Sequence, residues 1–109
     1  MAGENSEIVA LRDEFRGHLE QFYAMLKLAP PYHSVEKAIA HLTASLKAMA
    51  PEDRALVAAN PARRWAQYKV AFVESGLSQK HRGIIAGLAR SGQTGLPAEY
   101  QAFLDVYLS

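Results

Sequence analysis

The fold is decided by residues 4–31, which read ENSEIVALRDEFRGHLEQFYAMLKLAPP. Within this stretch the apolar side chains recur at steps of three and four residues, the spacing of one face of an α-helix. Two prolines follow the pattern, and neither can donate the backbone hydrogen bond that a continuing helix requires. The stretch therefore predicts a long first helix over residues 4–28. Its apolar face consists of Ile8, Leu11, Phe15, Leu19, Phe22 and Leu26.

The rest of the chain contains several residues that typically begin a helix. Ser34 and Ser78 are typical N-cap residues, each ahead of an apolar stripe. Pro51, Pro61 and Pro97 suit the first turn of a helix, where no backbone donor is needed. No stretch shows the two-residue alternation of a strand. We therefore expect an all-α protein, a compact bundle of five to six helices in a single domain over residues 1–109, with helices at about 4–28, 34–49, 51–59, 61–75, 78–91 and 97–108.

The fourth of these helices has apolar residues on more than one side. Its aromatic and branched side chains, Trp65, Tyr68, Val70, Phe72 and Val73, are spread over more than one helical face. Such a helix is usually buried on several sides. We expect it to be central in the bundle.

The composition excludes several classes of protein. Half of the 109 residues are hydrophobic and 21% are charged, as in an ordinary globular domain. There is no cysteine, which excludes disulfides and thiolate metal sites. No segment approaches the roughly 18 apolar residues of a membrane span, and the first residues are acidic where a signal peptide is basic. We expect a cytoplasmic protein with no membrane partner, and its abundant alanine suggests a GC-rich bacterial or phage genome.

Charge is unevenly distributed along the chain. Residues 1–60 have a net charge of −2, residues 61–95 carry six Lys or Arg against Glu74 alone, and residues 96–109 carry two acids. A basic stretch interleaved with Trp65 and Tyr68 fits phosphate groups or an acidic protein surface equally well. It also fits ordinary solvated charges around two helices.

Two glycines within the fifth predicted helix are the best local indication of an interface. Gly83 and Gly87 lie one turn apart, flanked by Arg82 and Arg90. Each glycine costs a helix about 1 kcal/mol relative to alanine, so a pair indicates close approach of another backbone. That backbone belongs either to another helix of the same chain or to a binding partner, and both explanations stay open.

The histidines do not form a motif. His18, His33, His41 and His81 include no pair at the three- or four-residue spacing of a helical metal site. His18 lies on the apolar face of the first helix, where a packed polar side chain is the expected role. Serine-nucleophile motifs are absent as well. We therefore expect no catalytic residue, no metal and no cofactor.

These observations predict a non-catalytic protein-binding or regulatory module that acts through a basic helical surface at about residues 61–95. The expected partner is another protein, and nucleic-acid binding through the same segment is the alternative. A small enzyme or metal protein using the histidines is the third reading. The face of the first helix spans about three heptads, which also allows a homodimer. The predicted partner-binding residues are Arg63, Arg64, Lys69, Lys80, Arg82, Gly83, Gly87 and Arg90.

Overall fold

The first helix is the centre of the molecule. A computed structural model describes residues 6–77, 81–92 and 95–108, and helix α1 covers Ser6–Met25. Every residue of the predicted apolar face is buried. The helix ends in a Schellman motif, in which the N–H of Leu28 donates to the carbonyl of Tyr23 at 2.9 Å. Lys27 takes the left-handed position of that motif, with φ of 59°. The helix is confirmed, but this motif ends it before the two prolines are reached.

Three helices follow, namely α2 (Tyr32–Ala48), α3 (Pro51–Ala59) and α4 (Pro61–Glu74). The prolines at the starts of α3 and α4 lie in first turns, as predicted. Asn60 adds a side-chain cap to α4, because its Oδ1 accepts from the N–H groups of Ala62 and Arg63 at 2.9 and 3.2 Å.

The predicted cap of α2 is wrong. The helix begins two residues before Ser34, and the N-cap position belongs to Pro31. The N–H of Val35 already donates to the carbonyl of Pro31 at 2.9 Å, so Ser34 is inside the first turn. Proline can take the cap position because its φ of −73° with ψ of 101° is extended backbone, and its missing N–H is not needed there.

The C-terminal part contains α6 (Arg82–Arg90), a 3₁₀ turn η1 (Ala98–Tyr100) and α7 (Gln101–Leu108). The predicted cap at Ser78 lies outside the described residues. The predicted last helix is divided into η1 and α7, which together cover almost the same residues. Its end is docked as expected, because Phe103, Leu104 and Tyr107 are buried.

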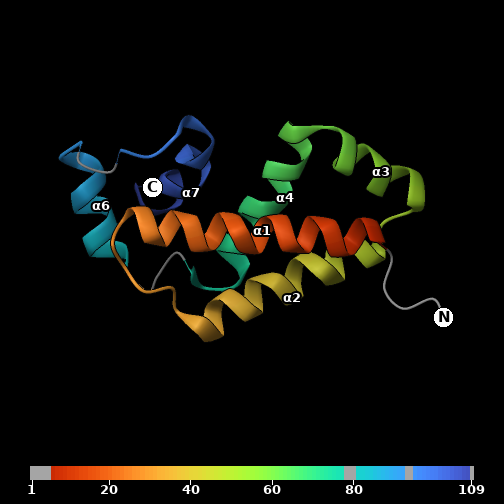
Figure 1. The fold of residues 1–109 in the computed structure, drawn as a ribbon, viewed down its shortest axis with the longest axis horizontal. Helices are drawn as coiled ribbons and strands as arrows, with labels where there is room; N and C mark the ends of the chain where they lie inside the picture. Colours follow the sequence, from red (N-terminus) through yellow and green to blue (C-terminus); the bar gives the residue numbers. More distant parts are fainter. Residues whose placement is uncertain (1–5, 78–80, 93–94, 109) are drawn as a thin grey trace.

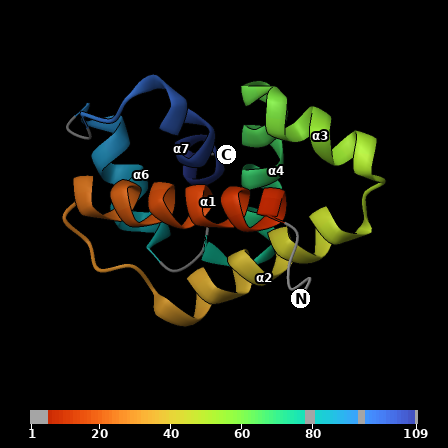
Figure 2. The same ribbon diagram turned by 45° about the vertical axis from the view of Figure 1, so that its right-hand side comes forward.

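The helices surround α1 (Figure 1). Helix α2 runs along one side of α1, while α3, α4, α6 and α7 lie on the other side or across it. Helix α4 packs on α2, α3 and α7, and α6 packs mainly on α7. In both views α7 lies between α4 and α6 (Figures 1 and 2). The described ranges contain six α-helices and no strand, so the predicted all-α bundle is confirmed.

The core is an aromatic cluster shared by α1, α4 and α7. Phe22 of α1 meets Phe103 of α7 with ring centroids 5.4 Å apart, and Phe72 of α4 at 6.0 Å. Phe72 and Phe103 stack on each other at 4.7 Å. Phe15 stacks on Tyr68 at 4.9 Å. These contacts join helices that are distant in the sequence, so α1, α4 and α7 form one packed unit.

The predicted burial of α4 on several sides is wrong. Tyr68, Ala71 and Phe72 are buried, but Val70 and Val73 are 49% and 43% exposed. Helix α4 therefore buries one face and presents a second apolar face outward.

No helix in the described ranges has both the length and the apolar character needed to cross a membrane.

Candidate functional site

The predicted basic surface is divided between two helices. Arg63 and Lys69 are exposed on α4, whereas Arg82 and Arg90 are exposed on α6. Helix α7 lies between them (Figures 1 and 2). Lys80 lies outside the described residues. A segment that is continuous in sequence thus supplies two separate surfaces.

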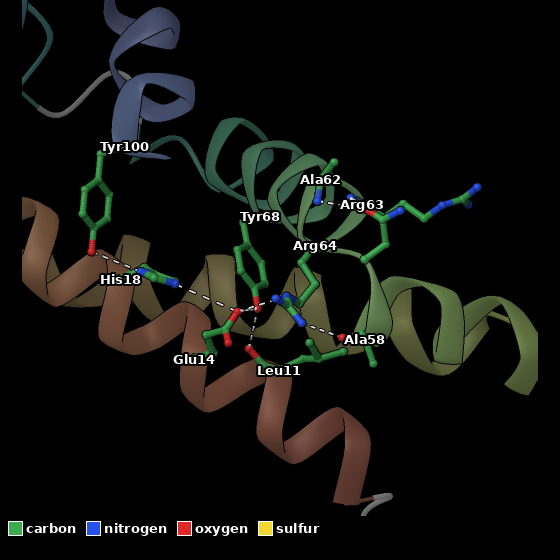
Figure 3. Close-up of polar contacts among 10 residues, drawn as sticks. Leu11, Glu14, His18, Ala58, Ala62, Arg63, Arg64, Tyr68 and Tyr100 are labelled. Atoms are coloured by element: carbon green, nitrogen blue, oxygen red, sulfur yellow. Dashed lines mark hydrogen bonds and ion pairs between the residues drawn. The ribbon is translucent and has the colours of Figure 1, made fainter. Parts of the chain in front are cut away.

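Arg64 belongs to neither surface, because it holds three helices together (Figure 3). Its Nη1 donates to the carbonyl of Ala58 in α3, and its Nε lies 3.4 Å from Glu14 Oε1 in α1. The same Glu14 oxygen accepts from the Tyr68 hydroxyl at 2.7 Å. Burial, and then the bond to the Glu14 carboxylate, raise the pKa of Tyr68. These contacts give Arg64 a structural role.

His18 extends this polar cluster toward the C-terminal part. The Tyr100 hydroxyl donates to Gln21 Oε1 at 2.9 Å, so its oxygen must accept from His18 Nδ1, 3.1 Å away. The opposite nitrogen, Nε2, faces Glu14 Oε1 at 4.0 Å, and the ring lies 4.7 Å from that of Trp65. His18 is therefore a packed polar side chain, as its place on α1 predicts.

The other histidines lie in different surroundings. His33 contacts Tyr32, and the ring of His81 lies 6.0 Å from that of Tyr23. Both ring nitrogens of His41 are buried, and neither has a hydrogen-bond partner among the described residues. No group of three or more metal-ligating side chains occurs in the part of the chain that the structure describes.

A groove of about 520 Å³ with several charged side chains in its lining lies between α1 and α2. Arg16 and Glu36 cross it with a paired contact, at 2.8 Å and 3.3 Å between their nitrogens and oxygens. That contact lowers the pKa of Glu36 and raises that of Arg16. Arg12, Asp13 and Lys47 add charges of both signs to the lining. Because its charges alternate, the groove does not favour a ligand of one sign.

The outer face of α6 is exposed, with open space at the glycine pair. Gly83 and Gly87 are exposed, and a Cβ added to either would meet no described atom within 4 Å. Ile84 lies beside them and is 55% exposed. Arg90 is exposed about two turns along the helix from Gly83. We call Gly83, Ile84, Gly87 and Arg90 the α6 surface.

Of the two explanations for the glycine pair, packing against another helix of the chain is not seen within the described ranges. No described helix approaches Gly83 or Gly87, so among the described residues nothing uses their missing side chains.

The chain matches no protein-family model, no curated protein and no solved structure.

The open space at the α6 glycines gives a stability prediction. Gly87→Ala should raise the free energy of unfolding by about 0.5–1 kcal/mol, because the new methyl group favours the helix and meets nothing. Gly76→Ala should lower it by about 1–2 kcal/mol, because Gly76 has φ of 81°. Urea unfolding followed by circular dichroism measures both. Destabilisation by Gly87→Ala would contradict the open surface.

Proposed function

We propose that the protein is a non-catalytic binding module whose α6 surface receives a helical segment of an acidic partner protein. The observation that carries this proposal is the exposed pair Gly83 and Gly87 in open space beside the exposed Ile84. Two helical glycines lower the stability of the free protein, and no contact within the described chain offsets this cost. A partner whose backbone lies close to α6 would require residues without side chains at Gly83 and Gly87.

Shape and apolar character favour a helix as the bound element. The two glycines leave a shallow strip along α6, and Ile84 stands at its edge as an apolar anchor. A partner helix with small residues along one face can bring its backbone close to such a strip, while a larger side chain packs on Ile84. Recognition of an amphipathic helix by an apolar surface is a common mode of peptide binding.

Charge supports an acidic partner. Helix α6 contains Arg82 and Arg90 and no acid, and Arg90 is exposed at the end of the glycine strip. Carboxylates on the partner would therefore be attracted to the surface and would meet no acidic residue of α6.

The arrangement of the aromatic residues favours protein over nucleic acid as the ligand. Tyr68 is buried against Phe15, and Trp65 packs on His18 and Phe103. Single-stranded nucleic-acid sites commonly stack bases on aromatic rings beside the cations. Tyr68 is buried and Trp65 is partly buried against the core, so neither is a freely exposed ring for such stacking.

The test is a selection of helical peptides on the immobilised full chain, from a displayed library of 20-residue helices with one randomised face. We expect the enriched peptides to be acidic, with small residues along the selected face. Gly87→Leu should weaken their binding at least about tenfold, because its side chain fills the strip. Gly17→Leu is the matched control, since Gly17 is also an exposed helical glycine with open space around it, on α1.

Circular dichroism of both leucine variants checks that the fold is kept. Equal binding of the selected peptides to wild type and Gly87→Leu would overturn the proposed site. A 20-base-pair DNA duplex serves as the second probe. Binding of that duplex that falls steeply with salt and is weakened by Arg90→Ala would replace the acidic protein with nucleic acid as the ligand.

A further inference from the structure

Helix α4 carries a second unpartnered surface, on the face opposite its buried residues. Ala62, Ala66, Val70 and Val73 are all exposed, and the two valines are 49% and 43% exposed. At 3.6 residues per turn these four positions fall within a sector of about 80°. They form an apolar stripe along the whole helix, which we call the α4 stripe, and no described element covers it.

One edge of the α4 stripe carries two opposite charges. Arg63 and Glu74 differ by about 20° around the helix and lie about 16 Å apart along its axis. Both are exposed, and neither side chain has a partner among the described residues. Figure 3 shows the Arg63 side chain pointing away from α1 and from the polar cluster.

The position of Glu74 is locally unfavourable. It is the last residue of α4, and a carboxylate there faces the negative end of the helix dipole. It is also the only acid among residues 61–95. A cation supplied from outside the chain would offset this repulsion.

We propose that α4 pairs with α4 of a second copy, antiparallel about a two-fold axis near residues 68–69. In an antiparallel pair, residues on the same edge of the two stripes face each other. Arg63 of each copy then lies beside Glu74 of the other, because the two residues are nearly equidistant from the axis. In the same register Ala66 of one copy lies within about 1.5 Å, along the axis, of Val70 of the other, so a small side chain lies beside a larger one across the interface.

This pairing explains features that the single chain leaves unexplained. The exposed valines are removed from water, and each Glu74 gains an arginine. The first helix offers no such alternative, because its apolar face is buried in the core of its own chain. Among the described residues, the α4 stripe therefore combines an exposed apolar surface with opposite charges that pair across a two-fold axis.

The dimer should be weak. A single helix pair buries less than the roughly 800 Å² per partner of a standard stable interface. Lys69 lies on the other edge of the stripe close to the axis, where the two copies bring like charges together. We expect a dissociation constant on the order of 100 μM, which Lys69→Ala should lower.

Sedimentation equilibrium of the full chain, from about 10 μM to 1 mM, tests the pairing. Wild type should change from monomer to dimer over this range. Arg63→Glu should weaken the dimer at least about tenfold, because it places two acids together, and Glu74→Arg should do the same with two cations. The double variant with Arg63→Glu and Glu74→Arg should restore the dimer, because it exchanges the two charges.

The charge exchange is the decisive step, since a surface contact elsewhere would not respond to it. A wild-type monomer at 1 mM would overturn the proposal, as would failure of the double variant to regain dimerisation. A dimer that persists in Val70→Asp would place the contact on another face and would overturn it too. Gly87→Leu should leave the dimer unchanged, so the α4 pairing and the proposed α6 site succeed or fail separately.

Discussion

Raising the pH above about 10 should unfold the protein cooperatively, because the fold buries four tyrosines as neutral donors. Tyr100 is one of them, and the other three are the most deeply enclosed. Tyr107 donates to the carbonyl of Leu77 at 2.7 Å, so Tyr23 must donate to Tyr107, 2.8 Å away. Tyr68 donates to the Glu14 carboxylate at 2.7 Å. All three rings are almost inaccessible to solvent. Losing any of these protons would leave a buried phenolate facing another oxygen.

The direction of the effect follows from the raised pKa values. Burial raises the pKa of Tyr23, Tyr68 and Tyr107, whereas an unfolded tyrosine ionises near its ordinary pKa of about 10. The stabilisation is therefore complete below pH 10 and is lost as the pH rises further. Each tyrosine contributes a slope of about 1.4 kcal/mol per pH unit, so these three together contribute about 4 kcal/mol per unit. Burial raises the pKa of Tyr100 as well, so Tyr100 adds to the slope in the same direction. A domain of ordinary stability, about 5–15 kcal/mol, loses its fold within a few pH units.

Tyrosinate absorbance and far-ultraviolet circular dichroism, recorded against pH, measure this unfolding. Apart from the contribution of Tyr32, whose ring is 69% exposed, the two signals should change together, because the buried tyrosines ionise only when the chain opens. Tyr68→Phe should reduce the slope of stability against pH by about 1.4 kcal/mol per pH unit, the contribution of one tyrosine. Tyr32→Phe is the control, since the Tyr32 ring is 69% exposed and its removal should leave the slope unchanged. Ionisation of all tyrosines before any loss of helix would contradict the prediction.

The helices could be predicted from the sequence because their signals are local. Proline in a first turn and apolar residues at three- and four-residue steps depend only on neighbours along the chain. These local signals predicted α1, α3 and α4. They misplaced the start of α2, because Ser34 is a typical cap residue but the extended backbone of the N-cap position occurs earlier, at Pro31.

The face that a helix buries was harder to predict. Helix α4 is apolar on several sides, and its periodicity does not say which side meets the core. Tyr68 and Phe72 are buried because α1 and α7 pack on them, and Val70 and Val73 then point outward. That choice depends on the positions of residues more than 30 apart in the sequence, which no local pattern encodes.

The candidate site could be predicted only in part, because it too depends on residues that are distant in the sequence. The basic stretch is continuous in sequence, but α7, formed by later residues, lies between α4 and α6. Arg64 resembles its neighbour Arg63 in sequence, and only the fold turns it toward Glu14, fifty residues earlier. Glu14 itself carried no signal, because its partners come from α4 and from its own helix. The glycine pair could be recognised from the sequence, because glycine inside a helix lowers helix stability and this effect depends only on local residues.

Phe22→Ala should be among the most destabilising single changes in the chain, lowering the free energy of unfolding by about 3–5 kcal/mol. Phe22 is fully buried, and its ring meets those of Phe72, Phe103 and Tyr107. Truncation removes apolar contacts on three helices and leaves a cavity among rigid rings that cannot collapse to fill it. Urea unfolding compared with wild type measures the loss.

The exposed valine Val70 supplies the matched control. Val70→Ala removes side-chain atoms from an exposed position and should change the free energy of unfolding by at most about 0.5 kcal/mol at concentrations where the chain is monomeric. Phe22→Leu keeps more of the buried volume and should cost clearly less than Phe22→Ala. A loss below about 2 kcal/mol for Phe22→Ala would mean that the aromatic cluster is not the core of the fold.

The stability lost in Phe22→Ala should differ from helix to helix. Phe22 holds η1 and α7 through Tyr100, Phe103 and Tyr107, whereas none of its ring contacts among the described residues is with an aromatic residue of α2. Hydrogen exchange of Phe22→Ala should therefore increase first in α7 and α6, which packs mainly on α7, while α2 keeps more of its protection. Equal loss of protection in α2 and α7 would show that the bundle opens only as a whole, and that Phe22 stabilises all helices alike.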